Sequence, residues 1–190
     1  MIDDAKAQAR IRARAQRNAI PDVDGAGTKA AIRFLDGIPL KPNSIVSLYW
    51  PLAGEFDCRP LLYALSNHEH HIALPLVRGR GEPLDFRIWR PGDPLVKRAF
   101  NVHEPLETAE KTVPHVVVTP FLAYNELGYR LGYGGGYYDR TLRGLRQSLA
   151  SVVAVGLGFA AQKMPELPFG ETDEPMDWLV TERVVTRFQS

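Results

Sequence analysis

The sequence predicts an α/β protein in which helices alternate with the strands of a mainly parallel sheet. Two observations lead to this fold class. Short runs rich in Val, Ile and Leu, typical of buried strands, alternate with segments of helical pattern over most of the chain. The chain has 190 residues, of which 45% are hydrophobic and 24% are charged, an ordinary globular composition. Strand–helix–strand units place their strands parallel in one sheet. The length suits one domain of this kind, which we expect to cover residues 1–190.

In the amino-terminal half, the pattern predicts three helices and three strands. Asp3 or Asp4 caps the first helix, and the alanines and arginines that follow favour helical backbone. Leu61 and Leu65 face inward from the third helix, and Pro51 ends the first strand. The predicted elements are a helix over 3–19, a loop over 20–27, a helix over 28–38, a strand over 43–51, a helix over 58–71, and strands over 71–77 and 84–89.

The carboxyl-terminal half continues the alternation around a stretch of glycines. A helix follows that stretch directly, as expected where a loop at the end of a strand leads into a helix. The predicted elements are a turn over 101–105, a strand around 116–118 within the segment 112–120, a helix over 137–150, a strand over 151–159, a loop over 165–175, and a strand or turn over 176–186.

Charge and cysteine content narrow the classes of function. The formal net charge is +1, so no overall field favours a nucleic acid or a membrane surface. Cys58 is the only cysteine, which excludes an intramolecular disulfide and fits a reducing compartment. The arginine-rich start lacks the apolar region of a secretory signal, and no apolar run is long enough to cross a membrane. We therefore expect a cytoplasmic protein.

The segment GYRLGYGGGYYDR, residues 128–140, is the strongest candidate for a ligand site. It lies between a predicted strand and a predicted helix, where open α/β sheets bind ligands, and its glycines let backbone N–H groups approach phosphate oxygens. It is not a P-loop, because no Gly-Lys-Ser/Thr follows, and Tyr137 stands where the dinucleotide fingerprint needs its third glycine. The alternative is a surface loop with tyrosines packed beneath it.

Two other patterns are weaker. GLGFAA, residues 156–161, matches a dinucleotide motif, but Pro165 and Pro168 cut short the helix that must follow. We expect a turn at the end of a strand there. A zinc-protease motif begins at His68 but fails at its closing position, Ile72. We expect the histidines around it to form a polar helix end on the surface.

Charged and aromatic residues mark three further candidates. Lys6 and Arg10 lie four positions apart on one face of the first helix, which suits phosphates or nucleic acid, or else is simply solvated. Trp50 and Glu55 follow the first strand and suit a flat heterocycle with an amidine-like edge, or else form an exposed rim. The acidic loop 171–177 offers oxygen ligands for Mg²⁺, or forms a solvated turn.

Together these segments resemble the 5-formyltetrahydrofolate cyclo-ligases, also called methenyltetrahydrofolate synthetases. The resemblance covers nearly the whole chain, and the long glycine signature is specific to that family. The family fold that it implies is a three-layer α/β/α single domain. The segments stand in the family's order: KAQAR (6–10), YWPLAGEFD (49–57), RLGYGGGYYDR (130–140), VGLGFAAQ (155–162) and TDEPMDWLVTE (172–182).

The resemblance implies that the chain uses ATP and Mg²⁺ to convert 5-formyltetrahydrofolate to 5,10-methenyltetrahydrofolate, releasing ADP and phosphate. It also implies that Asp139 and Asp173 hold the metal. The residues expected to bind ATP are Lys6, Arg10, Arg130, Leu131, Gly132, Tyr133, Gly134, Gly135, Gly136, Tyr137 and Tyr138. Those expected to bind the folate are Trp50, Glu55, Tyr133, Gly134, Gly135, Gly136 and Tyr137.

Two departures from the family pattern are visible. Tyr124 and Asn125 stand where the family often has Phe-Asp, and Thr172 stands where it often has histidine. We expect both departures to change local hydrogen bonds rather than the class of reaction. We expect only small-molecule partners, without nucleic acid or membrane, and a monomer or weak dimer. The alternative functions are a non-catalytic homologue that binds nucleotide or folate, and a nucleic-acid-binding protein, which the near-neutral charge disfavours.

Overall fold

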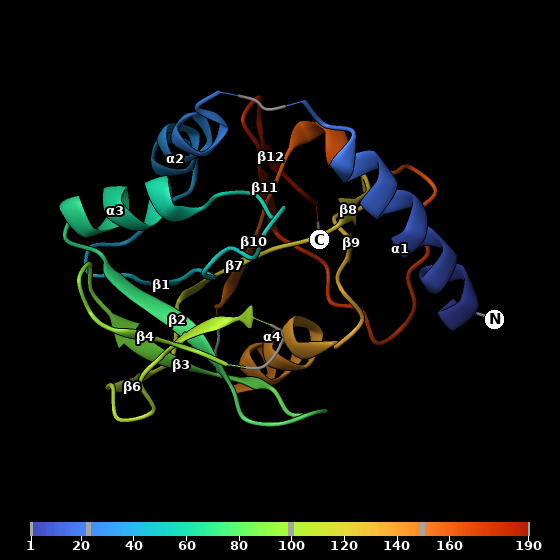
Figure 1. The fold of residues 1–190 in the computed structure, drawn as a ribbon. Helices are drawn as coiled ribbons and strands as arrows, with labels where there is room; N and C mark the ends of the chain where they lie inside the picture. Colours follow the sequence, from blue (N-terminus) through green and yellow to red (C-terminus); the bar gives the residue numbers. More distant parts are fainter. Residues whose placement is uncertain (1, 22–23, 99–100, 149–150, 190) are drawn as a thin grey trace.

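A mixed sheet of eight strands forms the centre of the protein (Figure 1). The structure is a computed structural model and describes residues 2–21, 24–98, 101–148 and 151–189. The strand order is β12-β11-β10-β7-β1-β2-β3-β6. The strands are β1 (Ile45–Ser47), β2 (His71–Val77), β3 (Leu84–Trp89), β6 (Lys111–Thr112), β7 (Val116–Thr119), β10 (Val153–Leu157), β11 (Trp178–Val180) and β12 (Val185–Arg187).

The middle of this sheet is parallel, and both of its edges are antiparallel. The run β11, β10, β7, β1 and β2 is parallel throughout, with Val46 of β1 aligned with Val116 of β7 and Ile72 of β2. β12 joins one edge antiparallel, and β3 followed by β6 joins the other. All four residues of β7 are buried, as a parallel strand covered on both faces requires. The predicted mainly parallel sheet is confirmed.

Helices cover both faces of the sheet, which gives three layers (Figure 1). α2 and α3 cover one face, where Leu62 and Val118 share a buried cluster, and α4 covers the other, where Leu142 meets Val117. Successive residues of a strand point to opposite faces, so neighbouring valines of β7 serve different layers. None of the helices in the described ranges is both long and apolar enough to span a membrane. The helices are α1 (Ile2–Asn18), α2 (Ala26–Gly37), α3 (Arg59–Asn67) and α4 (Tyr137–Ser148), with a short 3₁₀ helix at Ala160–Gln162.

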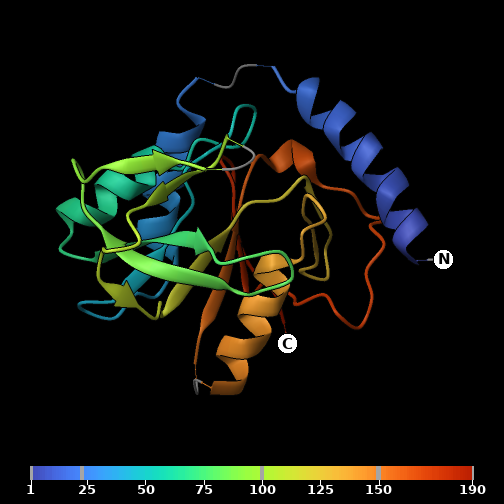
Figure 2. The ribbon, with the colours of Figure 1, turned by 60° about the horizontal axis from the view of Figure 1, so that its bottom comes forward.

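α1 lies to one side of these layers, beside a small hairpin (Figures 1 and 2). Ala9 and Ala13 are its buried residues, and they pack with Leu122, Leu131 and Leu167. Because alanine is small, the backbone of α1 comes close to the hairpin. The basic residues of α1 therefore lie near the glycines that follow the hairpin, residues 132–136. The hairpin consists of β8 (Ala123–Tyr124) and β9 (Arg130–Leu131); a second small pair consists of β4 (Leu95–Lys97) and β5 (His103–Pro105).

Most predicted elements are confirmed in kind, but several predictions are wrong in detail. Neither Asp3 nor Asp4 precedes the first helix as a cap, because α1 begins at Ile2; both lie in its first turn, where their charges favour the helix dipole. Residues 101–105 are not a plain turn, because part of them forms β5, which pairs with β4. The third helix does not reach residue 71. It ends at Asn67, and Glu69 then takes a positive φ of 59°, which stops helical hydrogen bonding before β2 begins. Parts of two predicted elements, 22–23 and 149–150, lie outside the described residues.

Candidate active site

One pocket of about 730 Å³ gathers the residues that the sequence singled out. Its walls include Tyr49, which follows β1, Pro120, which follows β7, and Val77 at the end of β2. The pocket therefore lies at the carboxyl edge of the parallel strands, where α/β sheets bind ligands. The predicted site residues that line it are Lys6, Arg10, Trp50, Glu55, Arg130, Leu131, Gly132, Tyr133, Gly134, Gly135, Gly136, Tyr137, Tyr138, Asp139 and Asp173.

The glycine stretch, residues 132–136, connects β9 to the first turn of α4 and forms one wall of the pocket. Gly134 and Gly136 have φ values of 107° and 64°, which side chains other than glycine rarely adopt. A Cβ on Gly134 would also lie 3.3 Å from the guanidinium of Arg10. Bare backbone at a helix N-terminus suits an anion, because free N–H groups and the helix dipole both favour negative charge.

Two basic residues of α1 face this wall. Nε of Arg10 donates to the carbonyl oxygen of Gly132 at 3.1 Å, which fixes the guanidinium beside the glycines. Nζ of Lys6 lies 2.7 Å from Oδ1 of Asp173, and both side chains are only 13% exposed. The basic face of α1 is therefore not simply solvated, because it contacts parts of the chain that are far away in sequence.

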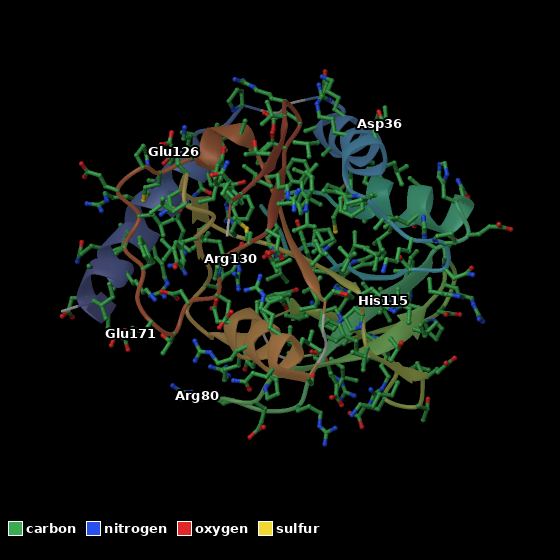
Figure 3. The ribbon with its side chains drawn as sticks, turned by 180° about the vertical axis from the view of Figure 1, so that it is seen from behind. Asp36, Arg80, His115, Glu126, Arg130 and Glu171 are labelled. Carbon is green, nitrogen blue, oxygen red and sulfur yellow. The ribbon has the colours of Figure 1, made fainter. Side chains whose placement is uncertain are left out.

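Arg130 is a buried anchor for the acidic side of the pocket. Its side chain is 3% exposed and lies in the interior, whereas Glu171 lies at the margin of the molecule (Figure 3). One amino group donates to Asp139 at 2.8 Å, and the other to the carbonyl oxygen of Glu174 at 2.6 Å. Burial lowers the pKa of Arg130, and the charge of Asp139 opposes that shift. Both amino groups are already bonded, so the expected contact between Arg130 and ATP stays a prediction.

Asp139 and Asp173 are oriented by backbone groups as well as by cations. The backbone N–H of Glu174 donates to Oδ1 of Asp139 at 3.2 Å, and that of Gly170 donates to Oδ2 of Asp173 at 2.7 Å. Within the described ranges, no three or more His, Cys, Asp or Glu side chains gather to hold a metal by themselves. Mg²⁺ commonly takes one or two carboxylates and completes its shell with waters and substrate phosphates. Two carboxylates beside a wall suited to phosphates fit that pattern.

Glu55 is held by backbone and surrounded by tyrosines. The backbone N–H of Leu52 donates to Oε2 of Glu55 at 2.8 Å. Burial raises the pKa of Tyr49, Tyr133 and Tyr138, and the negative charge of Glu55 raises each of them further. The three hydroxyl groups therefore stay neutral near pH 7. Such a carboxylate suits a ligand edge that carries N–H donors.

The sequence did not reveal the apolar wall of the pocket. Pro75 and Val77 of β2 and Leu84 of β3 belong to it, and His103 of β5 also lines the pocket, although no motif marks these residues. They are ordinary strand residues, and only the pairing of β2 with β3 brings them to the site. Trp50 closes the same region and meets the ring of Trp89 edge to face, with centroids 5.8 Å apart. Arg140 and Arg143 of α4 also line the pocket. Arg140 is the last residue of the glycine signature, so the sequence contained a signal for it.

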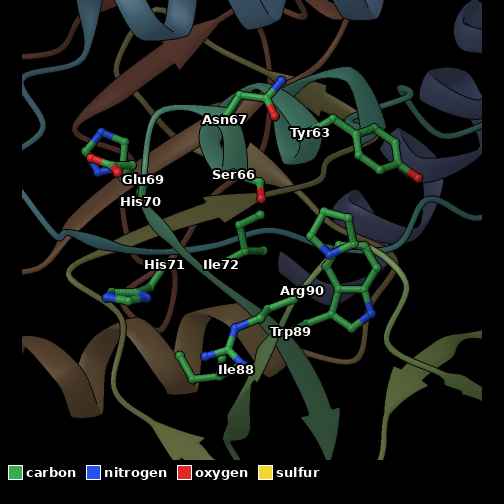
Figure 4. A pocket seen from close by; sticks show the side chains of 11 residues that line it. Tyr63, Ser66, Asn67, Glu69, His70, His71, Ile72, Ile88, Trp89 and Arg90 are labelled. Atoms are coloured by element: carbon green, nitrogen blue, oxygen red, sulfur yellow. The ribbon is translucent and has the colours of Figure 1, made fainter.

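Other sequence candidates lie elsewhere. Asp57 accepts from Nε of Arg59 at 2.8 Å at the start of α3. His70 and His71 line a separate cavity of about 570 Å³ below the end of α3, together with polar side chains of that helix (Figure 4). Residues 156–161 run from β10 into a single 3₁₀ turn, so the dinucleotide motif is a turn at a strand end, as expected.

The model of the 5-formyltetrahydrofolate cyclo-ligase family matches residues 3–182. The chain belongs to this family. A 5-formyltetrahydrofolate cyclo-ligase from Escherichia coli (strain K12) is 32% identical over 161 residues, which cover 82% of this chain and 87% of the relative. One from Mycolicibacterium smegmatis is 28% identical and covers 93% of each chain. The solved structure of Aquifex aeolicus 5,10-methenyltetrahydrofolate synthetase is similar with a TM-score of 0.79 and 29% identity, covering 97% of this chain and 93% of that one.

The structure shows where the two departures from the cyclo-ligase pattern lie, at Tyr124-Asn125 and at Thr172. Oδ1 of Asn125 accepts from the backbone N–H groups of Leu127 and Tyr129 at 3.1 and 2.9 Å, so the amide performs the turn-forming role of an aspartate. The hydroxyl of Tyr124 donates to Ala160 at 3.1 Å, away from the pocket lining. Thr172 does line the pocket, next to Asp173, and it is exposed.

Proposed function

We propose that this cyclo-ligase family member converts 5-formyltetrahydrofolate and ATP to 5,10-methenyltetrahydrofolate, ADP and phosphate. The observation that supports this most is the single pocket that unites the basic face of α1, the glycine stretch and the Trp50–Glu55 segment. The first two suit a triphosphate, and the third suits a pterin. Their meeting at one site is what a reaction between those two ligands requires.

The chemistry we propose is phosphoryl transfer followed by ring closure. The formyl oxygen on N5 attacks the γ-phosphorus of ATP, and ADP leaves. N10 then adds to the activated formyl carbon and loses its proton, and phosphate leaves. Phosphoryl transfer needs positioning and charge neutralisation above all, so we assign Arg10 and the glycine backbone to the phosphates. Lys6 would exchange its carboxylate partner, Asp173, for a phosphate.

The folate side of the reaction falls to the opposite part of the pocket. Glu55 would accept hydrogen bonds from the N–H edge of the pterin, and Trp50 with Tyr133 and Tyr137 would offer ring surface to its plane. The apolar wall from β2 and β3 would exclude water from the reacting groups. Exclusion matters because water would compete with N10 for the activated carbon.

Asp139 and Asp173 are the residues we assign to Mg²⁺. When bound there, the ion would neutralise charge on the phosphates during transfer. The two aspartates project from different segments, the start of α4 and the loop 171–177. Arg130 joins these segments, because it donates to Asp139 and to the carbonyl oxygen of Glu174.

An absorbance assay tests the proposed reaction directly. Purified protein mixed with ATP, Mg²⁺ and 5-formyltetrahydrofolate should form methenyltetrahydrofolate, which is followed by its absorption, with one ADP released per turnover. Omitting ATP should abolish the signal. Binding of both ligands without product would instead favour a non-catalytic homologue.

Replacing Arg10 with alanine is expected to raise the KM for ATP about tenfold and to change the KM for the folate little. The reason is that the guanidinium lies against Gly132 and Gly134, on the phosphate side of the pocket. A charge-assisted hydrogen bond of this kind contributes about 1.5–3 kcal/mol. Steady-state kinetics with each substrate varied in turn would measure it, with Arg12→Ala on the exposed side of α1 as the control. Equal effects on both KM values would contradict the assignment.

Replacing Asp139 or Asp173 with asparagine is expected to raise the Mg²⁺ concentration needed for half-maximal rate. Asparagine keeps the shape of the side chain but removes the charge that a hard cation prefers. Thr172→Ala is the matched control, because Thr172 lines the same pocket without a carboxylate. Magnesium titrations at saturating ATP and folate would compare the three variants. An unchanged midpoint for both aspartates would remove them from the metal site.

We further propose that the chain works in the cytoplasm as a monomer or weak dimer, on free small molecules. The sequence features behind this are the near-neutral charge and the lone buried cysteine, Cys58, which burial leaves with a raised pKa and so with low reactivity. Sedimentation analysis across a concentration series would test the oligomeric state.

A further inference from the structure

Arg17 of α1 lies just outside the pocket lining and contacts two segments that form it. Its Nη1 donates to the hydroxyl of Tyr133 at 2.6 Å, although the two residues are 116 positions apart. Its guanidinium also lies against Gly54, where a Cβ would be 3.3 Å from Nη2 and where φ is 79°. One side chain thus joins α1 to the glycine stretch and to the loop that carries Glu55.

Tyr133 and Glu55 both line the pocket. Burial raises the pKa of Tyr133, the charge of Glu55 raises it further, and Arg17 opposes that shift. A guanidinium only donates, so Tyr133 accepts from Arg17 and keeps its own proton for another acceptor. Glu55 is the carboxylate toward which that proton can turn, so the three residues are arranged from a cation outside the pocket to an anion inside it.

This arrangement has two consequences for Glu55. The backbone N–H of Leu52 fixes one oxygen of its carboxylate, and the hydroxyl of Tyr133, which Arg17 holds in place, can donate to the same carboxylate. In addition, Arg17 supplies compensating charge from behind Tyr133 without occupying space that a ligand needs. Gly54 is required there, because its backbone takes a left-handed conformation while packing on the guanidinium.

We propose that Arg17 is a positioning residue that orients Glu55 for the folate through the hydroxyl of Tyr133. This inference rests on the proposed function, because it concerns the ligand that Glu55 binds. It assigns Arg17 to the folate side of the pocket, although Lys6 and Arg10 on the same helix serve the phosphate side. α1 therefore contacts both halves of the site from one rigid element.

The test is a double-mutant cycle of wild type, Arg17→Gln, Tyr133→Phe and the double variant. Each is measured for KM of both substrates and, by calorimetry, for binding of 5-formyltetrahydrofolate without ATP. Arg17→Gln should raise the folate KM and dissociation constant about tenfold, with the ATP KM within about twofold. In the Tyr133→Phe background, Arg17→Gln should have no further effect, because the hydroxyl through which it acts is gone.

Arg12→Gln, on the exposed side of the same helix, is the control for a general effect on α1 and should leave all constants unchanged. Thermal melts of each variant establish that it is folded. Losses that multiply in the double variant, or a rise in the ATP KM equal to that for the folate, would overturn the role of Arg17 while leaving the proposed function intact. A wild-type protein that neither binds nor converts 5-formyltetrahydrofolate would overturn both.

Discussion

Glu55→Gln should weaken the binding of 5-formyltetrahydrofolate about tenfold to a hundredfold and leave ATP binding nearly unchanged. Burial raises the pKa of Tyr49, Tyr133 and Tyr138, the charge of Glu55 raises each further, and the backbone N–H of Leu52 holds the carboxylate. Glutamine has the same shape, but it loses the charge and presents a donor where an acceptor is needed. A hydrogen bond to a charged group contributes about 1.5–3 kcal/mol, and each 1.4 kcal/mol is a factor of ten.

Titration calorimetry with each ligand separately would measure this difference. Asp57→Asn is the matched control: Asp57 stands two positions later, but its carboxylate pairs with Arg59 outside the pocket. Equal losses for ATP and folate, or no loss for either, would remove Glu55 from the pterin site.

Arg130→Ala should lower the free energy of unfolding by about 2–3 kcal/mol. Removing one partner of a buried ion pair leaves the other charge uncompensated, which commonly costs about 3–5 kcal/mol. We expect a smaller loss than that because Asp139 is 25% exposed and water can reach it. The carbonyl oxygen of Glu174 also loses its donor, so the loop 171–177 should loosen at the same time.

Denaturant unfolding of the variant would give this free energy, and Arg98→Ala is the control. Arg98 pairs with Glu107 at 2.7 Å, but these side chains are 44% and 66% exposed, so its loss should change stability little. If the two variants were equally stable, the stabilising role of Arg130 would be wrong, and the residue would be available to bind ATP.

Local patterns in the sequence determined much of the fold. β2 and β3 occupy the segments expected for them, 71–77 and 84–89, because each is a self-contained apolar or alternating run. α1, α2 and α4 also appear where alanine, leucine and arginine favour helix. The shortest strands could not be predicted in this way. The strand expected around 116–118 is β7, but β6, which covers only Lys111–Thr112, was not expected, and its pairing with β3 is what defines it.

The sequence by itself determined which residue types the site would contain: the glycines that need left-handed backbone, the tryptophan and glutamate after the first strand, the basic face of α1 and the acidic loop. Their order along the chain also determined the family. Only the tertiary structure decided how they are paired. Lys6 meets Asp173 and Arg17 meets Tyr133 across 167 and 116 positions of sequence. Backbone propensities act over a few residues, whereas these contacts exist because alanines on α1 pack against the hairpin and Leu167 and so place the helix beside the pocket.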